Sequence, residues 1–264
     1  MIRAATETGW MLVHHRDHAV LAGDFASAWG NGTFPKPEPF ADIQFAVAHH
    51  DDGWIARDAL PSLTKDNKPE AFTRSLVGAY SAFEEIDLPN YLRVRGEATA
   101  AVAKHNAYAG ILVSMHTVNL LTEQADVATI RPEHRPSYDA FVEAQRSWQR
   151  ETAKLIGASA DHLQRGFEFL QCCDNLSLIA CSGYESEREL RHRHPDRHGV
   201  RHAFKVAPMG DNVWHLSPWP FAESRLEFTF PYRLVSNAAC SDLAAFRHAC
   251  AEAKVHQQRV TLVS

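Results

Sequence analysis

The sequence predicts a mainly α-helical protein that ends in a small β-rich appendage. Apolar residues recur every three or four positions as far as residue 182, which is the spacing of amphipathic helices. Beyond residue 200, short runs such as "RLEFTFPYRLVS" alternate between apolar and polar side chains, which is typical of antiparallel strands. We therefore expect a helical domain over residues 1–185 and a small C-terminal β-rich domain, residues 186–264, packed on it. Sheet should be confined to this last third.

Turn and breaker residues separate the expected elements. The first helix ends at "GNG" and the proline-rich "FPKPEP", the second ends near Gly53, and the third ends before Pro89. A long fourth helical pattern is interrupted near Gly96, and "RPEHRP" precedes the fifth helix. The predicted helices of the first domain cover residues 14–29, 40–51, 75–87, 91–125, 136–156 and 160–182. In the second domain a helix over 241–253 and a final strand, "RVTLV", follow the alternating runs.

Composition excludes several classes of partner. Hydrophobic residues make up 45% of the chain and charged residues 22%, which suits a globular protein with a large core. The formal net charge of −5 predicts no nucleic-acid partner. No segment approaches the roughly 18 apolar residues of a membrane span, and the N-terminus lacks the apolar core of a signal peptide. With five cysteines and no CxxC pair, the sequence predicts a cytoplasmic protein without a membrane partner, and it leaves a homo-oligomer open.

Five ionisable residues fall on or beside the apolar stripes of the predicted helices: His18, His50, Asp51, His116 and Asp174. A single core histidine is most often an ordinary buried histidine. A buried carboxylate is different, because it must be protonated, paired with a cation or bound to a metal. The stripes offer no lysine or arginine to the two aspartates, but they do offer imidazoles. Two carboxylates and three imidazoles are a suitable ligand set for a divalent metal ion.

A histidine, a His-Asp doublet and a distant aspartate on separate helices resemble the HD superfamily of metal-dependent phosphohydrolases. The matching residues are His18, the doublet His50 and Asp51 in "HDDG", and Asp174 in "CDNLSL". Longer stretches of sequence around these residues ("RDHAVLAGDFASAWG", "HHDDGW", "ILVSMHT") are similar to an uncharacterised bacterial family of domains of unknown function. The resemblance covers about residues 12–182 and implies an HD-like helical bundle in which the four residues hold a metal ion. In the superfamily this ion activates water for attack on phosphorus or, in di-iron members, helps to activate oxygen.

The resemblance also suggests residues for catalysis. Additional histidines between the doublet and the last aspartate signal a second metal in the superfamily, and His116 lies in that interval. We expect one or two ions of Fe, Mn, Zn or Mg, with His116 as a ligand of the second ion or of the substrate. His49 and Asp52 flank the doublet and are further candidate catalytic residues, as proton shuttles or hydrogen-bond partners of the ligands. A capping or exposed role for these two is equally open.

Basic residues in the loop after the doublet are candidates for substrate binding. Arg57, Lys65 and Lys68 could clamp a phosphate beside the metal, and solvated loop charges are the alternative. His194 and two further histidines follow one another at a spacing of four, but Pro195 and Gly199 between them weaken any helix. We expect that stretch to be a solvated loop.

These observations lead to one preferred function and two alternatives. The preferred function is metal-dependent hydrolysis of a phosphate ester or a nucleotide-like small molecule by an HD-type phosphohydrolase, with a phosphorylated small molecule as the partner. The first alternative is an HD-type di-iron oxygenase on the same fold. The second is a non-catalytic module that binds a metal or a ligand without turnover.

Overall fold

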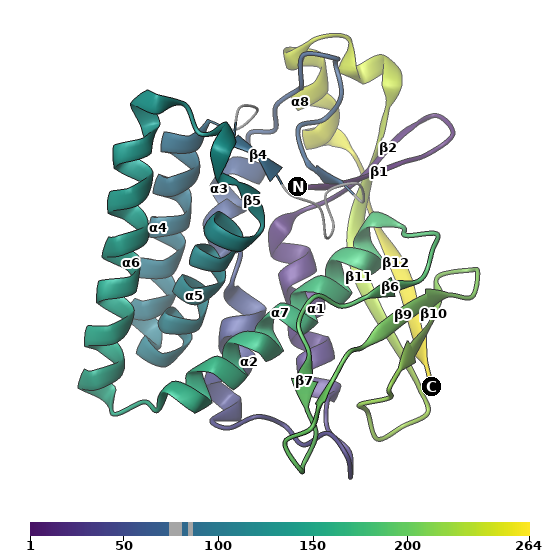
Figure 1. Ribbon diagram of the computed structural model, residues 1–264. Helices are drawn as coiled ribbons and strands as arrows, with labels where there is room; N and C mark the ends of the chain where they lie inside the picture. Colours follow the sequence, from purple (N-terminus) through teal and green to yellow (C-terminus); the bar gives the residue numbers. More distant parts are fainter. Residues whose placement is uncertain (74–80, 84–86) are drawn as a thin grey trace.

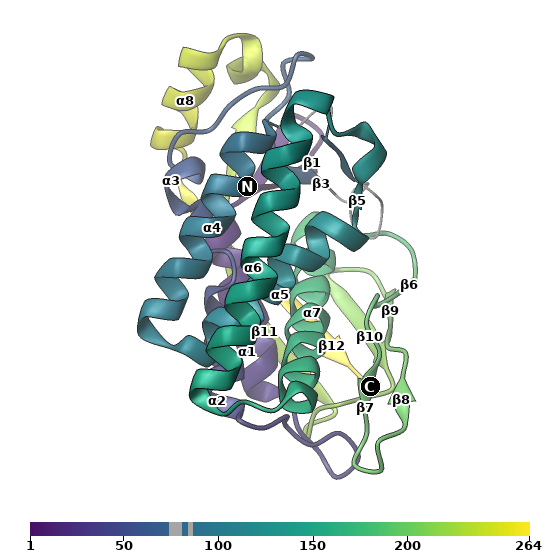
Figure 2. The same ribbon diagram turned by 60° about the vertical axis from the view of Figure 1, so that its left-hand side comes forward.

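The helices and the sheet of this protein lie in successive layers (Figure 1). The structure, a computed structural model, describes residues 1–73, 81–83 and 87–264. One face of the sheet packs against α1 (His15–Ala28) and α7 (Ala160–Ser182). Helix α5 (Ala107–Glu123) packs on α7 and on α2 (Phe40–His49). Helices α4 (Leu88–His105) and α6 (Arg135–Ile156) lie outside α5 (Figure 2). The helices α1, α2, α5 and α7 therefore meet in the interior, between the sheet and the outermost helices.

The described residues form one mixed sheet of eight strands in the order β3-β1-β2-β11-β12-β10-β9-β6. Its two long central strands, β11 and β12, pair antiparallel with Phe228 opposite Val260. Strand β2 pairs with the other side of β11, with Leu12 opposite Arg233. The strands of this sheet are β1 (Ile2–Ala5), β2 (Gly9–Val13), β3 (Phe72–Thr73), β6 (Arg188–Glu189), β9 (Lys205–Pro208), β10 (Val213–Ser217), β11 (Arg225–Ser236) and β12 (Val255–Val263).

The predicted fold class, a mainly α bundle with a small β appendage, is wrong, and so is the description of the chain as all-α. Strands β1 and β2 lie within the first 13 residues and join the same sheet as the C-terminal strands. Sheet is therefore not confined to the last third of the chain. The hairpin is short, and its place in the sheet depends on the distant partner β11, which no local periodicity reveals. Ile2 and Val13 are fully buried in the main core, so burial of their side chains stabilises the pairing.

Most of the predicted helices are present near their predicted positions, α1, α2 and α7 among them. The predicted 91–125 helix is instead two helices that meet at Asn106, whose side chain accepts a hydrogen bond from the Ala109 amide and caps the second. Gly96 stays helical. Of the predicted 75–87 helix, residues 75–80 and 84–86 lie outside the described residues. The remaining helical segments are α3 (Ile55–Asp58), α4 (Leu88–His105), α6 (Arg135–Ile156) and α8 (Leu243–Glu252), with short 3-10 turns at η1 (Asp52–Trp54), η3 (Val127–Thr129), η4 (Pro132–His134) and η5 (Asn237–Ser241).

None of the helices in the described ranges is long and apolar enough to cross a membrane. The interior helices are apolar because they pack on other elements. The ring of Phe25 on α1, for example, meets Phe228 of β11 edge-on, with 4.8 Å between the ring centroids. Leu226, Phe228 and Phe230 share this face of β11, as their alternation predicted, while the intervening residues are exposed.

The His/Arg-rich stretch after α7 is not the solvated loop that we expected. Strands β7 (His194–Pro195) and β8 (Arg201–His202) form a two-stranded hairpin, and a second two-stranded pair joins β4 (Ser81–Ala82) to β5 (Ala125–Asp126). His194 is buried, with its ring 5.3 Å from that of Trp29 and 5.4 Å from that of Phe169. Packing of the hairpin against α7 and Trp29 overrides the polar composition. The division of the chain at residues 185 and 186 stays a prediction, although β2 and β11 link the two parts in one sheet.

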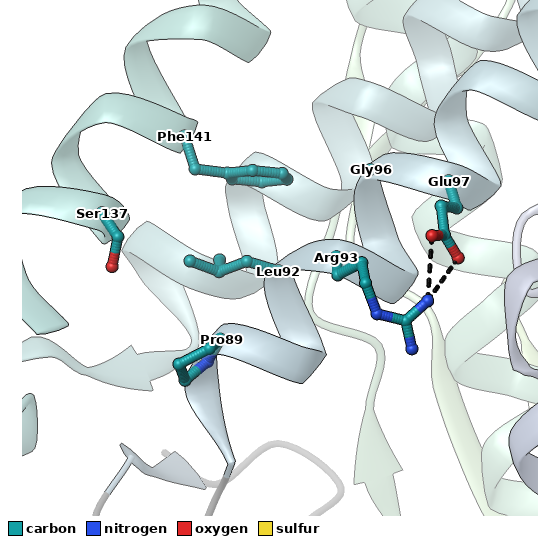
Figure 3. A pocket seen from close by; sticks show the side chains of 7 residues that line it. All are labelled: Pro89, Leu92, Arg93, Gly96, Glu97, Ser137 and Phe141. Atoms are coloured by element: carbon teal, nitrogen blue, oxygen red, sulfur yellow. Dashed lines mark hydrogen bonds and ion pairs between the residues drawn. The ribbon is translucent and has the colours of Figure 1, made fainter.

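A hollow of 380 Å³ opens at the surface between α4 and α6 (Figure 3). Pro89, Leu92 and Phe141 are among the residues that line it. The ion pair between Arg93 and Glu97 lies at its edge. This hollow does not include any of the five ionisable residues that the stripes singled out.

Candidate functional site

The structure brings the five ionisable residues of the stripes together in the interior. They are buried, and four elements carry them: His18 on α1, His50 and Asp51 at the end of α2, His116 on α5, and Asp174 on α7. These helices are the ones that meet between the sheet and the outer layer. The convergence follows from the apolar stripes, because each stripe faces the same core and carries its polar residue inward.

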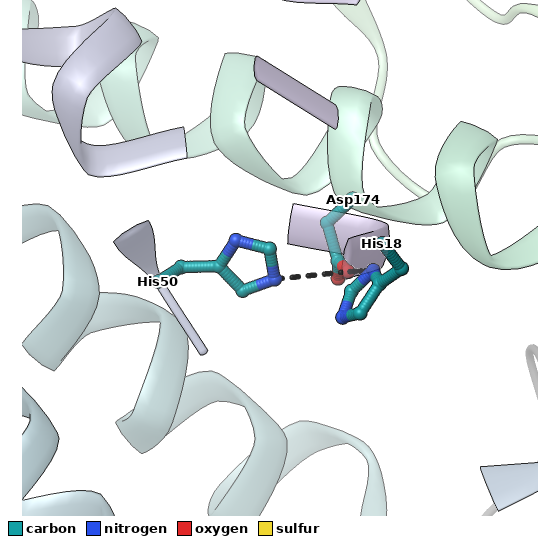
Figure 4. Close-up of side chains that lie close together, drawn as sticks. All are labelled: His18, His50 and Asp174. Atoms are coloured by element: carbon teal, nitrogen blue, oxygen red, sulfur yellow. Dashed lines mark ion pairs between the residues drawn. The ribbon is translucent and has the colours of Figure 1, made fainter. Parts of the chain in front are cut away.

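The imidazole and carboxylate groups of this cluster face one another at short range (Figure 4). His50 Nε2 lies 3.3 Å from Asp174 Oδ1, and His18 Nδ1 lies 3.9 Å from the same oxygen. His18 Nε2 lies 3.0 Å from Asp51 Oδ2. Two overlapping sets, His18–His50–Asp174 and His50–Asp51–His116, each place one ligand atom per residue within 4.8 Å of the others. His50 belongs to both sets and is the centre of the cluster.

Two of the three imidazoles have their Nδ1 atom engaged by a carbonyl oxygen of the protein, which can only accept a hydrogen bond. His50 Nδ1 donates to the main-chain oxygen of Val47 at 2.7 Å. His116 Nδ1 donates to Gln171 Oε1 at 2.5 Å, and Gln171 Nε2 in turn donates to Asn119 Oδ1 at 2.7 Å. Each contact leaves Nε2 as the free ring nitrogen, which is how metal-binding histidines are commonly oriented. His50 Nε2 is fully buried and has no hydrogen-bond partner among the residues described.

The third imidazole, His18, has a protein oxygen beside each ring nitrogen. Its Nδ1 lies 3.0 Å from Ser177 Oγ, and that hydroxyl lies 2.8 Å from the main-chain oxygen of Asp174. Its Nε2 lies 3.0 Å from Asp51 Oδ2. When Nδ1 donates to the serine, Nε2 presents its lone pair to the carboxylate, and a cation between these two atoms would stabilise that arrangement.

Asp51 also has a partner that the sequence analysis missed. Arg95, from α4, places Nη1 2.6 Å from Asp51 Oδ1, and both side chains are buried. The expectation that no arginine reaches the two aspartates is therefore wrong for Asp51. Gly53 makes the approach possible, because a Cβ at this position would overlap Ala98 and the main-chain oxygen of Val94 on the same helix.

These contacts change the proton affinities of the cluster. Burial alone would lower the pKa of His50, but the carboxylates of Asp51 and Asp174 outweigh it and raise that pKa to about 9. Burial would raise the pKa of Asp51, but the charges of Arg95 and His50 hold it well below its usual value. Burial lowers the pKa of His116 to about 4, which keeps this imidazole neutral. Without a metal the cluster therefore holds a proton on His50, at the position where a cation is needed.

Arg95 and Gln171 are the functional candidates that we did not predict. Arg95 lies three residues after Leu92 on a helix whose buried face continues to Val102, so the stripe criterion could have found it. Gln171 lies one helical turn before Asp174 on the same buried face. A polar residue on an apolar stripe was the available signal in both cases.

The predicted catalytic pair His49 and Asp52 lies apart from the cluster. His49 Nδ1 and Asp52 Oδ2 are 2.6 Å apart, and Arg16 Nε lies 3.2 Å from the other carboxylate oxygen of Asp52. The side chains of the pair are 28% and 26% exposed, respectively. Within the described ranges neither residue contacts a cluster carboxylate or imidazole, so any catalytic role for them stays a prediction.

The predicted phosphate clamp is also only partly assembled around the cluster. The guanidinium of Arg57 lies over the Trp54 ring at 5.2 Å, and Arg95 lies at 5.1 Å from the same ring. Arg57 also pairs with Glu70. Lys65 and Lys68 are exposed in the following loop, and among the described residues their side chains do not contact the cluster. Their role in substrate binding stays a prediction.

The fold and the cluster together define a mixed α/β protein with a buried His/Asp site. Residues 1–237 match the family described as protein of unknown function (DUF3891), and the chain belongs to this family. The expectation of an uncharacterised domain family is thus confirmed. Neither a curated protein nor a solved structure gives a match to the chain.

Proposed function

We propose that this protein is a metal-dependent hydrolase of phosphate esters and that His18, His50, Asp51 and Asp174 bind its divalent ion. The orientation of the imidazoles is the observation that carries the proposal. His18 and His50 use Nδ1 for an oxygen of the protein and turn Nε2 toward two buried carboxylates. His50 Nε2 lies 3.3 Å from Asp174 Oδ1 without forming a hydrogen bond in the described part of the chain, and His18 Nε2 lies 3.0 Å from Asp51 Oδ2. Both nitrogens are therefore placed to bind a cation together with the carboxylates.

The order of the proposed metal ligands along the sequence supports hydrolysis of phosphate esters. A histidine, a His-Asp doublet and a late aspartate on separate helices resemble the HD superfamily of phosphohydrolases. A divalent ion held by such residues supplies a Lewis acid and lowers the pKa of water bound to it, which yields a nucleophile near neutral pH.

The chain's own residues supply the rest of the site. Arg95 keeps Asp51 ionised and oriented, because its guanidinium lies 2.6 Å from Oδ1 and leaves Oδ2 directed at the imidazoles. His116 is neutral and buried, and Gln171 fixes its Nδ1 as the protonated nitrogen. Its Nε2 can therefore accept a hydrogen bond, bind a second ion or take a proton beside the substrate. Burial of all these groups strengthens their electrostatic interactions with a bound phosphoryl group.

Metal content is the first test of this proposal. The full chain purified without chelator should contain a transition metal, and Asp174→Ala should lose most of it. Asp161→Ala is the matched control, since Asp161 is an exposed aspartate on the same helix that pairs with Arg165. Removing the metal from the wild-type protein should lower Tm, because an ion bound only by the native state stabilises it by about 3 kcal/mol at a hundred times its Kd. Full occupancy in Asp174→Ala, or an unchanged Tm after complete removal of the metal, contradicts the metal centre.

Activity is the second test. The metal-loaded protein should release phosphate or an alcohol from a panel of phosphomonoesters and phosphodiesters. His116→Ala should retain at least one ion and lose turnover, whereas Asp161→Ala should keep both. Stoichiometric metal with no turnover on any phosphate ester contradicts the hydrolase and favours a binding module. Oxygen uptake by the iron-loaded protein with a small substrate favours an oxygenase instead.

A further inference from the structure

Arg95 is held at the edge of the cluster by three neighbours. Its Nη1 pairs with Asp51 Oδ1 at 2.6 Å, and its Nε donates to Tyr91 Oη at 3.3 Å. The guanidinium plane also lies over the ring of Trp54 at 5.1 Å. These contacts fix the position of the guanidinium without using all of its hydrogen-bond donors.

The unused donors of Arg95 are on Nη2. In the described part of the chain this nitrogen has no hydrogen-bond partner, although the Arg95 side chain is only 8% exposed. The side chains of Asp51 and Asp174 are 6% and 9% exposed, while those of His18 and His50 are 1% and 0% exposed. What little access the cluster has is therefore at its carboxylates and its guanidinium, so an incoming ligand meets Arg95 together with the metal-binding oxygens.

The charges of the cluster select the ligand. Two carboxylates and one guanidinium leave one net negative charge when the imidazoles are neutral, and none when His50 carries its proton. A divalent ion bound to neutral imidazoles gives one net positive charge in a buried site, where an uncompensated charge is costly. An anion that accepts hydrogen bonds on two oxygens would cancel the charge and satisfy Nη2 in one step.

We propose that Arg95 is an oxyanion-binding residue and that the site accepts a phosphoryl group only after the metal is bound. The inference rests on the proposed metal centre and deepens it, because it assigns the residue that recognises the substrate. Without the metal the carboxylates balance the positive charges of the site, so the site has no net attraction for an anion. With the metal, Arg95 and the ion attract the phosphoryl oxygens together, so each ligand raises the affinity for the other.

Inorganic phosphate and Mn²⁺ are the probes for this proposal. Phosphate titrated into the Mn²⁺-loaded full chain should bind, seen by calorimetry and by faster ³¹P relaxation than free Mn²⁺ causes. The metal-free protein should bind phosphate at least about tenfold more weakly. Arg95→Lys keeps the charge but loses the planar fork, and it should weaken phosphate binding by about tenfold while retaining Mn²⁺. The matched control is Arg93→Lys, two residues away on the same helix but exposed and paired with Glu97, which should bind as the wild type does.

The outcomes separate this inference from the metal centre. Wild-type protein that binds Mn²⁺ but not phosphate, or Arg95→Lys that binds phosphate as the wild type does, overturns the inference and leaves the metal centre standing. Wild-type protein that takes up no Mn²⁺ contradicts both the metal centre and the claim that phosphate binding requires the metal. In that case Arg95 is judged from metal-free phosphate binding alone. Weaker binding to Arg95→Lys than to the wild type supports the role of Arg95, and equal binding overturns that role. If Arg95→Lys does not fold, the wild-type protein alone decides. Its affinity for Mn²⁺ is then measured with and without phosphate and corrected for the binding of Mn²⁺ by phosphate in buffer. The inference expects a higher affinity with phosphate, and an unchanged affinity overturns it.

Discussion

Arg95 and Asp51 form a buried ion pair that joins α4 to the turn after α2, with 2.6 Å between Nη1 and Oδ1. The pair is connected directly to the candidate site, because the other carboxylate oxygen of Asp51 faces His18. A buried pair of this kind contributes little net stability compared with apolar side chains, but removal of one partner leaves the other charge buried and unpaired. The arginine therefore makes it possible for an ionised aspartate to lie in the core.

Arg95→Met tests this relationship in the metal-free protein. Methionine fills much of the same volume but leaves Asp51 without its guanidinium, so the free energy of unfolding should fall by about 3–5 kcal/mol. Urea denaturation measures the loss. Arg93→Met, on the exposed face of the same helix, should cost less than about 1 kcal/mol. Equal losses in the two variants would show that the buried pair does not hold the two elements together.

Gly53→Ala tests how closely the turn after α2 approaches α4. A methyl group at this position would overlap Ala98 and the main-chain oxygen of Val94, which are packed too tightly to yield. We expect a loss of about 1–3 kcal/mol from overpacking, together with weaker metal binding because Asp51 lies two residues away. Unfolding and metal titrations on the same preparation measure both effects. Gly157→Ala is not a suitable control, since that glycine has a positive φ of 66° and ends α6. Gly96→Ala is better, because only the edge of the Phe141 ring is close to its Cβ position.

Gln171→Ala tests whether the amide next to His116 orients the imidazole. Gln171 accepts from His116 Nδ1 and is itself fixed by Asn119, so its loss frees the ring to rotate and to change tautomer. Loss of such a partner typically lowers metal affinity or activity by about 10- to 100-fold. Gln164→Ala is the control, because Gln164 is an exposed residue of the same helix whose amide donates to Glu168. If the two variants bind metal and turn over substrate equally, the amide has no orienting role.

The helical part of the fold and the members of the cluster could be predicted from the sequence for the same reason. A polar residue on an apolar stripe is forced into the core, so His18 and Asp174 were placed correctly before their neighbours were known. The N-terminal hairpin could not be predicted in this way, because it joins the sheet through pairing of β2 with the distant strand β11 and not through a pattern of its own. Arg95 was missed as a partner of Asp51 because ion pairing depends on which helices become neighbours, and stripe analysis treats each helix alone.

His194 was misjudged for a related reason, and its burial predicts a pH dependence. The hairpin that carries it looked solvated, yet the ring lies between Trp29 and Phe169, and burial lowers its pKa to about 4. The unfolded chain, with an ordinary histidine pKa near 6.5, binds a proton more readily than the native protein between these two values. Stability from this group is therefore complete above pH 6.5 and is lost as the pH falls toward 4, by up to about 3 kcal/mol.

His194→Phe should remove this contribution, because phenylalanine keeps the aromatic packing and does not titrate. The free energy of unfolding, measured in urea from pH 7 to pH 4, should fall less steeply in the variant than in the wild type. Other histidines with a lowered pKa, such as His15 and His116, also make the protein less stable at low pH. The relevant quantity is therefore the difference between the wild type and the variant in how steeply the free energy of unfolding falls with pH. His198→Phe, at an exposed position of the same hairpin, should leave the slope unchanged. If the free energy of unfolding falls equally with pH in His194→Phe and in the wild type, then His194 binds its proton as readily in the native protein as in the unfolded chain. The hairpin would then not be the acid-sensitive part of the fold.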